Sequence, residues 1–236
     1  MVACSRINTI GSPGAFLRAL DDTIARYSLL DHPFYREWSK GSLPREALVE
    51  YAKQYYAHVR NFPVYLSAAH SRCGDEQVRQ LLLENLVDEE LGEENHPELW
   101  LRFADGLGIA RSEVREAELL PETKRSVRAL KLLTTGESYL EGVAALYAYE
   151  SQVPEIARSK RDGLKDFYGI EDERSLSYFA VHEEADLVHR RMERDILKEK
   201  ALDDETRYRV LDAAEASARA MWAFLDGCYS AFVKAA

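Results

Sequence analysis

The helical spacing of apolar residues along almost the whole chain is the feature that most constrains its fold. From residue 13 to 30 and from 44 to 66, apolar side chains recur three or four positions apart, which predicts amphipathic helices. No segment alternates apolar and polar residues as a half-buried strand would. The pattern therefore predicts an all-α, single-domain bundle of about seven helices that spans residues 1–236.

Proline and glycine give the expected helix boundaries. Proline is favoured in the first turn of a helix and disrupts a helix interior, and Ser or Asp often caps the start. Pro63 and Pro154 should therefore kink or interrupt the helices in which they fall, and Pro97 should end or bend a helix at His96. The stretches expected to be helical are 13–30, 33–38, 44–72, 75–96, 98–107, 121–135, 139–168, 172–200 and 204–233.

Composition excludes several classes of protein. The net charge of −10 argues against a nucleic-acid surface, because phosphate binding needs clustered Lys and Arg. Neither an apolar run of about 18 residues nor a basic N-terminal segment leading into one is present, so no membrane span or signal peptide is expected. Cys4, Cys73 and Cys228 lack CxxC spacing, which predicts free thiols in a reducing compartment. We therefore expect a cytoplasmic protein.

The stretch 178–195 contains two histidines and an aspartate at metal-ligand spacing. His182, Asp186 and His189 stand at relative positions i, i+4 and i+7, so they point along one face of a helix. Two imidazoles and a carboxylate on one face are a suitable partial ligand set for a divalent metal. From these residues alone, a charged outer face that happens to contain two histidines is the alternative.

Two other segments offer further ligands. Glu89 and His96 are seven residues apart, so a continuous helix would stack them on one face. Glu150 follows an apolar run, where an unpaired carboxylate is costly to bury; a cation would offset that cost, and a salt bridge in the core is the alternative. With the previous three residues they make three carboxylates and three imidazoles. That set suits two divalent first-row metals such as iron or manganese, with positions open for oxygen.

Four blocks of sequence resemble a known family. They are His32-Pro33-Phe34-Tyr35, residues 85–90 with Asn95-His96-Pro97, residues 147–152, and the histidine–aspartate set of 182–189. Together they look like the CADD family, named for a Chlamydia protein associating with death domains. That family lies in the haem-oxygenase-like group, which also holds thiaminases and pyrroloquinoline-quinone synthases. The resemblance covers nearly the whole chain and implies a haem-oxygenase-like fold whose metals are bound by Glu89, His96, Glu150, His182, Asp186 and His189.

The resemblance also implies an unusual activity, the oxygen-dependent synthesis of p-aminobenzoate for folate. A centre of Fe with Fe or Mn would use dioxygen and an external reductant, and Tyr35 would be excised as the aromatic source. Lys160 holds the position of the family's candidate amine donor. Tyr51, Tyr149 and Tyr178 adjoin the motifs and could relay electrons or merely pack. Similar proteins are commonly homodimers, and the same is expected here.

From the residues alone, ordinary structural roles remain possible for Tyr35 and Lys160. Tyr35 beside Phe34 is typical of aromatic packing, and Lys160 of a solvated surface lysine. In a straight helix Lys160 would stand ~15 Å along the axis from Glu150, unless a bend at Pro154 shortens that distance.

Two other functions compete with the self-consuming one. The first is a dimetal oxygenase that acts catalytically on an external small molecule, with Tyr35 as pocket lining. The second is a non-enzymatic helical bundle that binds a protein partner through an apolar stripe at Trp222, Phe224 and Leu225 and keeps a structural metal site. That stripe is also compatible with core packing or a dimer interface.

Overall fold

The computed structural model describes residues 10–234, apart from the side chains of Glu184 and Ala185. Within that range the regular elements are all helical, which confirms the predicted all-α class. They are α1 (Pro13–Ala25), the 3₁₀ helix η1 (Leu29–Asp31), α2 (Pro33–Ser39), α3 (Arg45–Val59), α4 (Phe62–Arg72), α5 (Glu76–Glu90), α6 (His96–Leu107), α7 (Arg111–Arg115), α8 (Pro121–Thr134), α9 (Tyr139–Glu150), α10 (Val153–Tyr168), α11 (Glu173–Lys200) and α12 (Asp204–Phe232).

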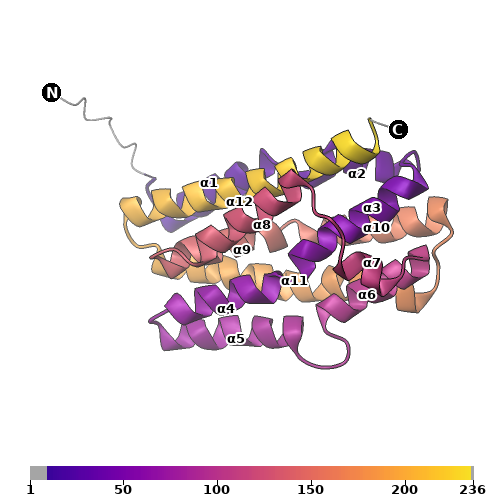
Figure 1. Cartoon of the computed structure of the whole chain (residues 1–236). Coiled ribbons are helices and arrows are strands. Elements are labelled where there is room, and N and C mark those ends of the chain that lie inside the picture. The colour runs from indigo at the N-terminus through magenta and orange to yellow at the C-terminus, as the bar shows by residue number, and fades with distance from the viewer. Residues whose placement is uncertain (1–9, 235–236) are drawn as a thin grey trace.

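Two long helices organise the bundle. The C-terminal helix α12 packs against α8, α9 and α1, and forms the upper edge of the molecule in Figure 1. The other long helix, α11, packs against α6, α9 and α10, while α4 and α5 lie side by side along the lower edge. Helix α9 contacts both long helices and therefore lies at the centre of the bundle.

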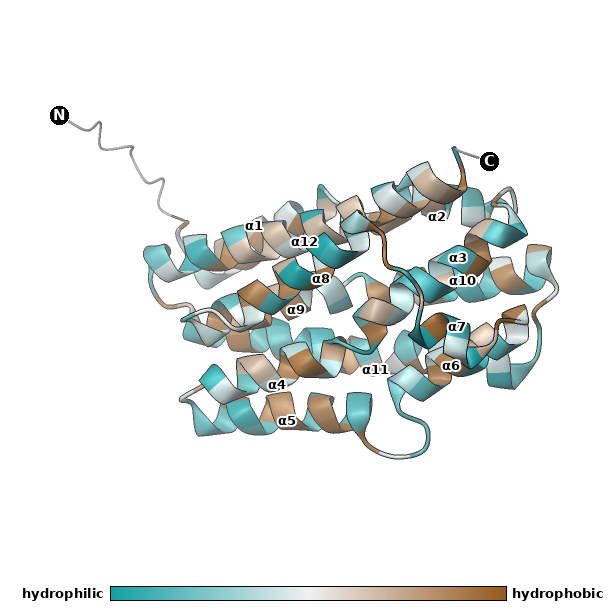
Figure 2. Ribbon diagram, in the orientation of Figure 1, coloured by the Kyte–Doolittle hydropathy of each residue, from teal (hydrophilic) through white to brown (hydrophobic). Residues whose placement is uncertain are grey.

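The distribution of hydropathy explains this arrangement. Most helices carry hydrophobic residues on one part of their surface and hydrophilic residues on another, as Figure 2 shows. Helix α9 is the exception, because every residue from Gly142 to Glu150 is buried. A helix that is apolar all round belongs in a core, and this one brings Glu150 into the interior with it. No helix within residues 10–234 is long and apolar enough to cross a membrane.

Side-chain caps begin several of the helices that later carry functional groups. Asp75 accepts hydrogen bonds from the backbone N–H groups of Gln77 and Val78 at the start of α5. Asn95 accepts one from Glu98 at the start of α6, at 3.0 Å. His32 caps α2, because its Nδ1 accepts from the backbone N–H of Phe34 at 3.1 Å.

The helix count differs from the predicted seven because prolines divide the chain more completely than expected. Pro63 does not kink a continuous helix: α3 ends at Val59, and Pro63 lies in the first turn of the separate helix α4. Helix α1 ends at Ala25 instead of Leu30, and η1 follows before Pro33 starts α2. An N-terminal proline is compatible with a new helix and incompatible with the interior of an old one, so the chain restarts.

Two cysteines and most of the proposed docking stripe are buried in the bundle. Cys73 and Cys228 are free and buried, whereas Cys4 lies outside the described residues. Phe224 and Leu225 are fully buried in the core and Trp222 packs against it. The stripe is therefore core packing.

Gly163 on α10 provides a test of how closely α10 and α2 pack. A Cβ at this position would lie 2.9 Å from Trp38 Cδ1 and 3.3 Å from the Trp38 carbonyl oxygen. Alanine favours a helix by about 1 kcal/mol over glycine, but overpacking a core costs about 1–3 kcal/mol. We expect Gly163→Ala to lower the free energy of unfolding by about 1 kcal/mol in urea denaturation. Gly14→Ala is the matched control, since its Cβ would meet its nearest side-chain atom at an ordinary 3.6 Å. Equal or greater stability of Gly163→Ala would show that the α2–α10 contact is looser than this.

Candidate metal centre and tyrosine pocket

The six ligands predicted from the sequence come from four helices and meet inside the bundle. Glu89 is in the last turn of α5, His96 is the first residue of α6, Glu150 is the last residue of α9, and three ligands lie in the middle of α11. All six are at most 5% exposed. They form two groups, in each of which the candidate ligand atoms lie within 4.8 Å of one another: Glu89, His96 and His182, and then Glu150, Asp186 and His189.

In the first group, a ring nitrogen of His96 lies very close to a carboxylate oxygen of Glu89. His96 Nδ1 lies 2.7 Å from Glu89 Oε1, yet Nδ1 has no hydrogen-bond partner of acceptable geometry. The imidazole rings of His96 and His182 are 4.3 Å apart between centroids. Two ligand atoms that approach so closely without a hydrogen bond are well placed to coordinate one cation together.

The pairing of Glu89 with His96 corrects the sequence-based picture. The two residues were expected to stack on one face of a single helix, but α5 ends at Glu90 and α6 begins at His96. Pro97 is in the first turn of α6, so the backbone turns before His96 instead of continuing α5. A loop, and not helical periodicity, brings the carboxylate and the imidazole together.

In the second group, one imidazole lies between two carboxylates. His189 Nδ1 is 3.4 Å from Glu150 Oε1 and 3.7 Å from Asp186 Oδ1. Asn85 on α5 donates from Nδ2 to both oxygens of Glu150, at 3.1 and 3.4 Å. The amide therefore orients the Glu150 carboxylate from outside the ligand set.

Two of the histidines are held by hydrogen bonds at their outer ring nitrogens. His182 Nδ1 lies 2.6 Å from the carbonyl oxygen of Tyr178, so Nδ1–H donates and Nε2 is left with its lone pair facing the site. His189 Nε2 lies 3.2 Å from Asp88 Oδ2 and leaves Nδ1 for the second group. Such outer partners select the tautomer that a ligating histidine needs.

The unsatisfied polar atoms of the site fit bound metals. Among the buried side-chain atoms without a hydrogen-bond partner are His96 Nδ1, His189 Nδ1 and both oxygens of Asp186. Buried polar atoms are nearly always paired, and their concentration at one place indicates a group that they bind in common. Carboxylates and imidazoles in this proportion suit divalent first-row metals, one at each group.

The pKa values of the ligands are shifted because charged groups lie close together in a buried site. Burial and the charge of Glu150 raise the pKa of Asp186 to about 7, although the nearby imidazole of His189 opposes them. Burial alone would lower the pKa of His189, but the carboxylates of Asp186 and Glu150 outweigh it and raise that pKa to about 11. Burial and the neighbouring His96 hold the pKa of His182 well below its usual value.

A phenol, a second phenol and an amine form a buried cluster beside the centre. The hydroxyls of Tyr35 and Tyr51 are 2.7 Å apart, and Lys160 Nζ donates to the Tyr51 hydroxyl at 2.7 Å. Lys160 Nζ also lies 4.5 Å from the centre of the Tyr35 ring. Lys160 is only 5% exposed, so the solvated-surface alternative is wrong for it.

The position of Lys160 also resolves the objection from helix length. Helix α9 ends at Glu150 and α10 begins at Val153, so the two residues are not on one straight axis. Helix α10 packs along α2, and Trp38 Nε1 donates to the Lys160 carbonyl oxygen at 3.2 Å. Burial lowers the pKa of Lys160 well below its ordinary value, which favours a neutral amine.

Tyr55, which the sequence analysis did not single out, links this cluster to the metal ligands. Its hydroxyl is 2.6 Å from that of Tyr149, the residue before Glu150, and its ring stacks on Tyr51 with centroids 5.4 Å apart. The ring centroids of Tyr178 and His182 are 4.0 Å apart, and Tyr178 lines the same small cavity as Tyr35, Tyr149 and Lys160. Tyr51 and Tyr55 are four residues apart, so both lie on one face of α3. This spacing could have identified Tyr55 from the sequence.

A cavity of about 20 Å³ lies among these side chains, between Tyr35, Tyr55, Tyr149, Lys160 and Tyr178. A space needs only about 10–15 Å³ to hold one water molecule, so a molecule of that size fits. A much larger hollow of about 930 Å³ lies between α1, the α9–α10 junction and α11, but none of the six predicted ligands lines it.

The chain is similar to known proteins both in sequence and in fold. Residues 49–222 match a family described as iron-containing redox enzymes. The chain is 44% identical over 211 residues to the 4-aminobenzoate synthase of Chlamydia muridarum, covering 89% of each chain. It is 42% identical over 223 residues to the 4-aminobenzoate synthase of Nitrosomonas europaea, covering 91% of each. Among solved structures, a TenA homologue from Pseudomonas syringae superposes with a TM-score of 0.78 at 16% identity, over 94% of this chain and 97% of the other. That likeness supports the predicted fold.

Metal binding should release protons. At pH 7 His189 is an imidazolium in the metal-free site, because its pKa is about 11. A ligating imidazole must be neutral, so we expect release of at least about one proton per chain and an affinity that rises about tenfold per pH unit for each proton released. Calorimetric titration with Mn(II) in buffers of different ionisation enthalpy measures this number. His189→Gln should lose the release, whereas His70→Gln, on α4 outside the site, should retain it. An affinity independent of pH would contradict the assigned protonation state.

Proposed function

Because this chain belongs to the family of iron-containing redox enzymes and shares most of its length with 4-aminobenzoate synthases, we propose that it synthesises 4-aminobenzoate with its own Tyr35 as the aromatic source. The observation that carries the proposal is the buried contact between Lys160 Nζ and the Tyr35 ring, at 4.5 Å. An aromatic ring and an amine are the two parts that 4-aminobenzoate contains.

The environment of Tyr35 and Lys160 supports this use of both residues. Burial lowers the pKa of Lys160, so its nitrogen keeps the lone pair that a nucleophile needs. Burial, with a smaller contribution from the neighbouring Tyr55, keeps the pKa of Tyr35 well above that of a free phenol. Tyr35 therefore remains a phenol that gives up its proton together with an electron, and the hydroxyl of Tyr51, which contacts both Tyr35 and Lys160, can pass that proton toward the neutral amine.

The bond changes follow from the structure of the product. The Cα–Cβ bond of Tyr35 breaks: Cα takes a hydrogen atom and stays in the chain as a glycine, while Cβ is oxidised from a methylene to the carboxylate, with a net loss of four electrons. The phenol oxygen leaves as water, and the ring gains nitrogen from Lys160 as the Cε–Nζ bond breaks and Cε is oxidised to an aldehyde. With the two electrons lost at Lys160 Cε, six electrons are released in all; two molecules of dioxygen accept eight, and an external reductant supplies the other two. Each chain contains one Tyr35 and one Lys160, so it acts once.

The two groups of ligands would hold two divalent metals, iron with iron or iron with manganese, which when bound supply the electrons that activate dioxygen. The protein's part is to hold that chemistry in a dry interior. Tyr178 and Tyr149 stand beside the ligands His182 and Glu150, and Tyr55 connects them to the Tyr35 cluster. This set of side chains is suited to carry electrons and protons over the distance between the centre and Tyr35.

The size of the cavity favours consumption of Tyr35 over an external substrate. At about 20 Å³ it accepts a molecule such as dioxygen and excludes an aromatic acid unless the surrounding tyrosines move. The partner-binding alternative loses its support, because the proposed stripe at Phe224 and Leu225 is buried.

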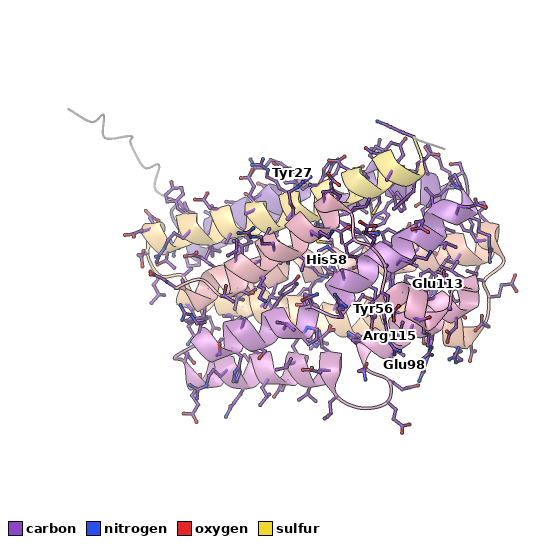
Figure 3. All side chains as sticks on the ribbon, viewed as in Figure 1. Tyr27, Tyr56, His58, Glu98, Glu113 and Arg115 are labelled. Carbon is purple, nitrogen blue, oxygen red and sulfur yellow. The ribbon has the colours of Figure 1, made fainter. Side chains whose placement is uncertain are left out.

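Replacing Tyr35 tests self-consumption directly. Metal-free protein is loaded with Fe(II), with or without Mn(II), and then receives reductant and air. We expect at most one 4-aminobenzoate per chain and a peptide mass that has lost the side chain of residue 35, because the source is the protein itself. Tyr35→Phe should yield no product while it still binds metal. Tyr27→Phe is the matched control: Tyr27 lies at the upper edge of the molecule in Figure 3, where its hydroxyl donates to Glu215. More than one product per chain, or product from Tyr35→Phe, would show that the aromatic ring comes from an external substrate.

Isotope labelling tests the amine donor. Protein produced with ¹⁵N at the lysine side chains should yield 4-aminobenzoate that carries the label, because Lys160 is the buried amine beside the ring. The peptide that contains residue 160 should then carry an aldehyde in place of the amine. Lys165→Arg, later on the same helix, should leave the label unchanged, and Lys160→Arg should abolish it. Unlabelled product would assign the nitrogen to a solution amine.

A further inference from the structure

Glu193 lies on the same face of α11 as the ligands of the second group. It follows His189 by four residues and Asp186 by seven, which keeps all three within about 60° around the helix axis. Side chains of a helix lean toward its N-terminus, so the Glu193 carboxylate is directed back along α11 toward Asp186 and His189. Its position is thus equivalent to that of a ligand one turn further along.

The surroundings of Glu193 hold no partner for its carboxylate. Its exposed fraction is 0%, and neither Oε1 nor Oε2 has a hydrogen-bond partner among the described residues. The side chain interacts with the carboxylates of Glu150 and Asp186, and it lies just outside the group of Glu150, Asp186 and His189 ligand atoms that are within 4.8 Å of one another. The arginines that flank it are engaged elsewhere, Arg190 with Glu155 and Arg194 with Asp21. A carboxylate buried against other carboxylates is costly unless a cation joins them.

The charge of the proposed centre points to the same need. Two divalent cations bring four positive charges, whereas the predicted ligands bring three carboxylates and three neutral imidazoles. One positive charge would remain in a site that excludes water, and a fourth carboxylate removes it. Among the buried acidic side chains of residues 10–234, Glu193 is the one outside the predicted set.

We propose that Glu193 is a further metal ligand, which binds the cation held by Glu150, Asp186 and His189 through its carboxylate. The inference rests on the two-metal centre proposed above. A structural carboxylic acid that only donates a hydrogen bond to Glu150 is the competing role, and it predicts a different response to substitution. Glutamine has the same shape and donates from its amide, but it carries no negative charge.

The test compares wild type, Glu193→Gln and Glu199→Gln by anaerobic titration with Mn(II) or Fe(II) and by thermal unfolding. Glu199 is an exposed acid further along α11 and serves as the matched control. We expect Glu193→Gln to weaken the second equivalent of metal about 100-fold and leave the first nearly unchanged. The metal-free variant should melt at a higher temperature than wild type, because a buried acid has been removed from an acidic site. Its melting temperature should rise less when metal is added.

Each other result overturns the assignment. Wild-type affinity for both equivalents in Glu193→Gln would establish the hydrogen-bonding role, while the two-metal centre would stand. A lower melting temperature of the metal-free variant would show that Glu193 stabilises the fold without a cation. Fewer than two metals bound by wild type itself would reject the two-metal centre together with the role of Glu193. Loss of metal binding in Glu199→Gln would show that the effect of charge is not local.

Discussion

The concentration of buried acids and imidazoles is the constraint on which the rest of this structure depends. Helices α5, α6, α9 and α11 each bring polar groups into an interior that otherwise contains aromatic and aliphatic side chains. Without cations such a site is electrostatically unfavourable, which raises the pKa of Asp186 and leaves polar atoms unpaired. The fold tolerates that cost because cations offset it. Metal binding and the stability of the bundle should therefore be closely linked.

The same interior gives the tyrosine cluster its chemistry. Removal from water favours the neutral forms of Lys160 and Tyr35, because it lowers the pKa of the amine and raises the pKa of the phenol. Neither form would predominate to the same degree at an exposed position. The 2.7 Å contacts through Tyr51 then hold the amine and the phenol at one place. In the proposed function, burial sets the protonation of both groups, and the metals would supply the oxidation chemistry.

The arrangement of helix ends explains why the two parts of the site adjoin. Glu150 is the last residue of α9 and Tyr149 precedes it, so one turn serves both the metals and the tyrosines. On α11, Tyr178 precedes His182 by four residues and supplies the carbonyl oxygen that orients it. A single helix face therefore extends from the tyrosine pocket through the ligands. A substitution in the tyrosine pocket should therefore affect the metal ligands, and the reverse.

The sequence by itself determined the all-α class, most helix starts and six ligand candidates, because helical periodicity, proline and the chemistry of His and Asp act locally. Only the tertiary structure decided that Glu89 meets His96 across a loop, that Lys160 faces Tyr51, and that Glu193 is buried against Glu150. These facts depend on how separate helices pack, since the direction of a side chain on one helix says nothing about which helix lies opposite. Periodicity predicts a face; packing decides what that face meets.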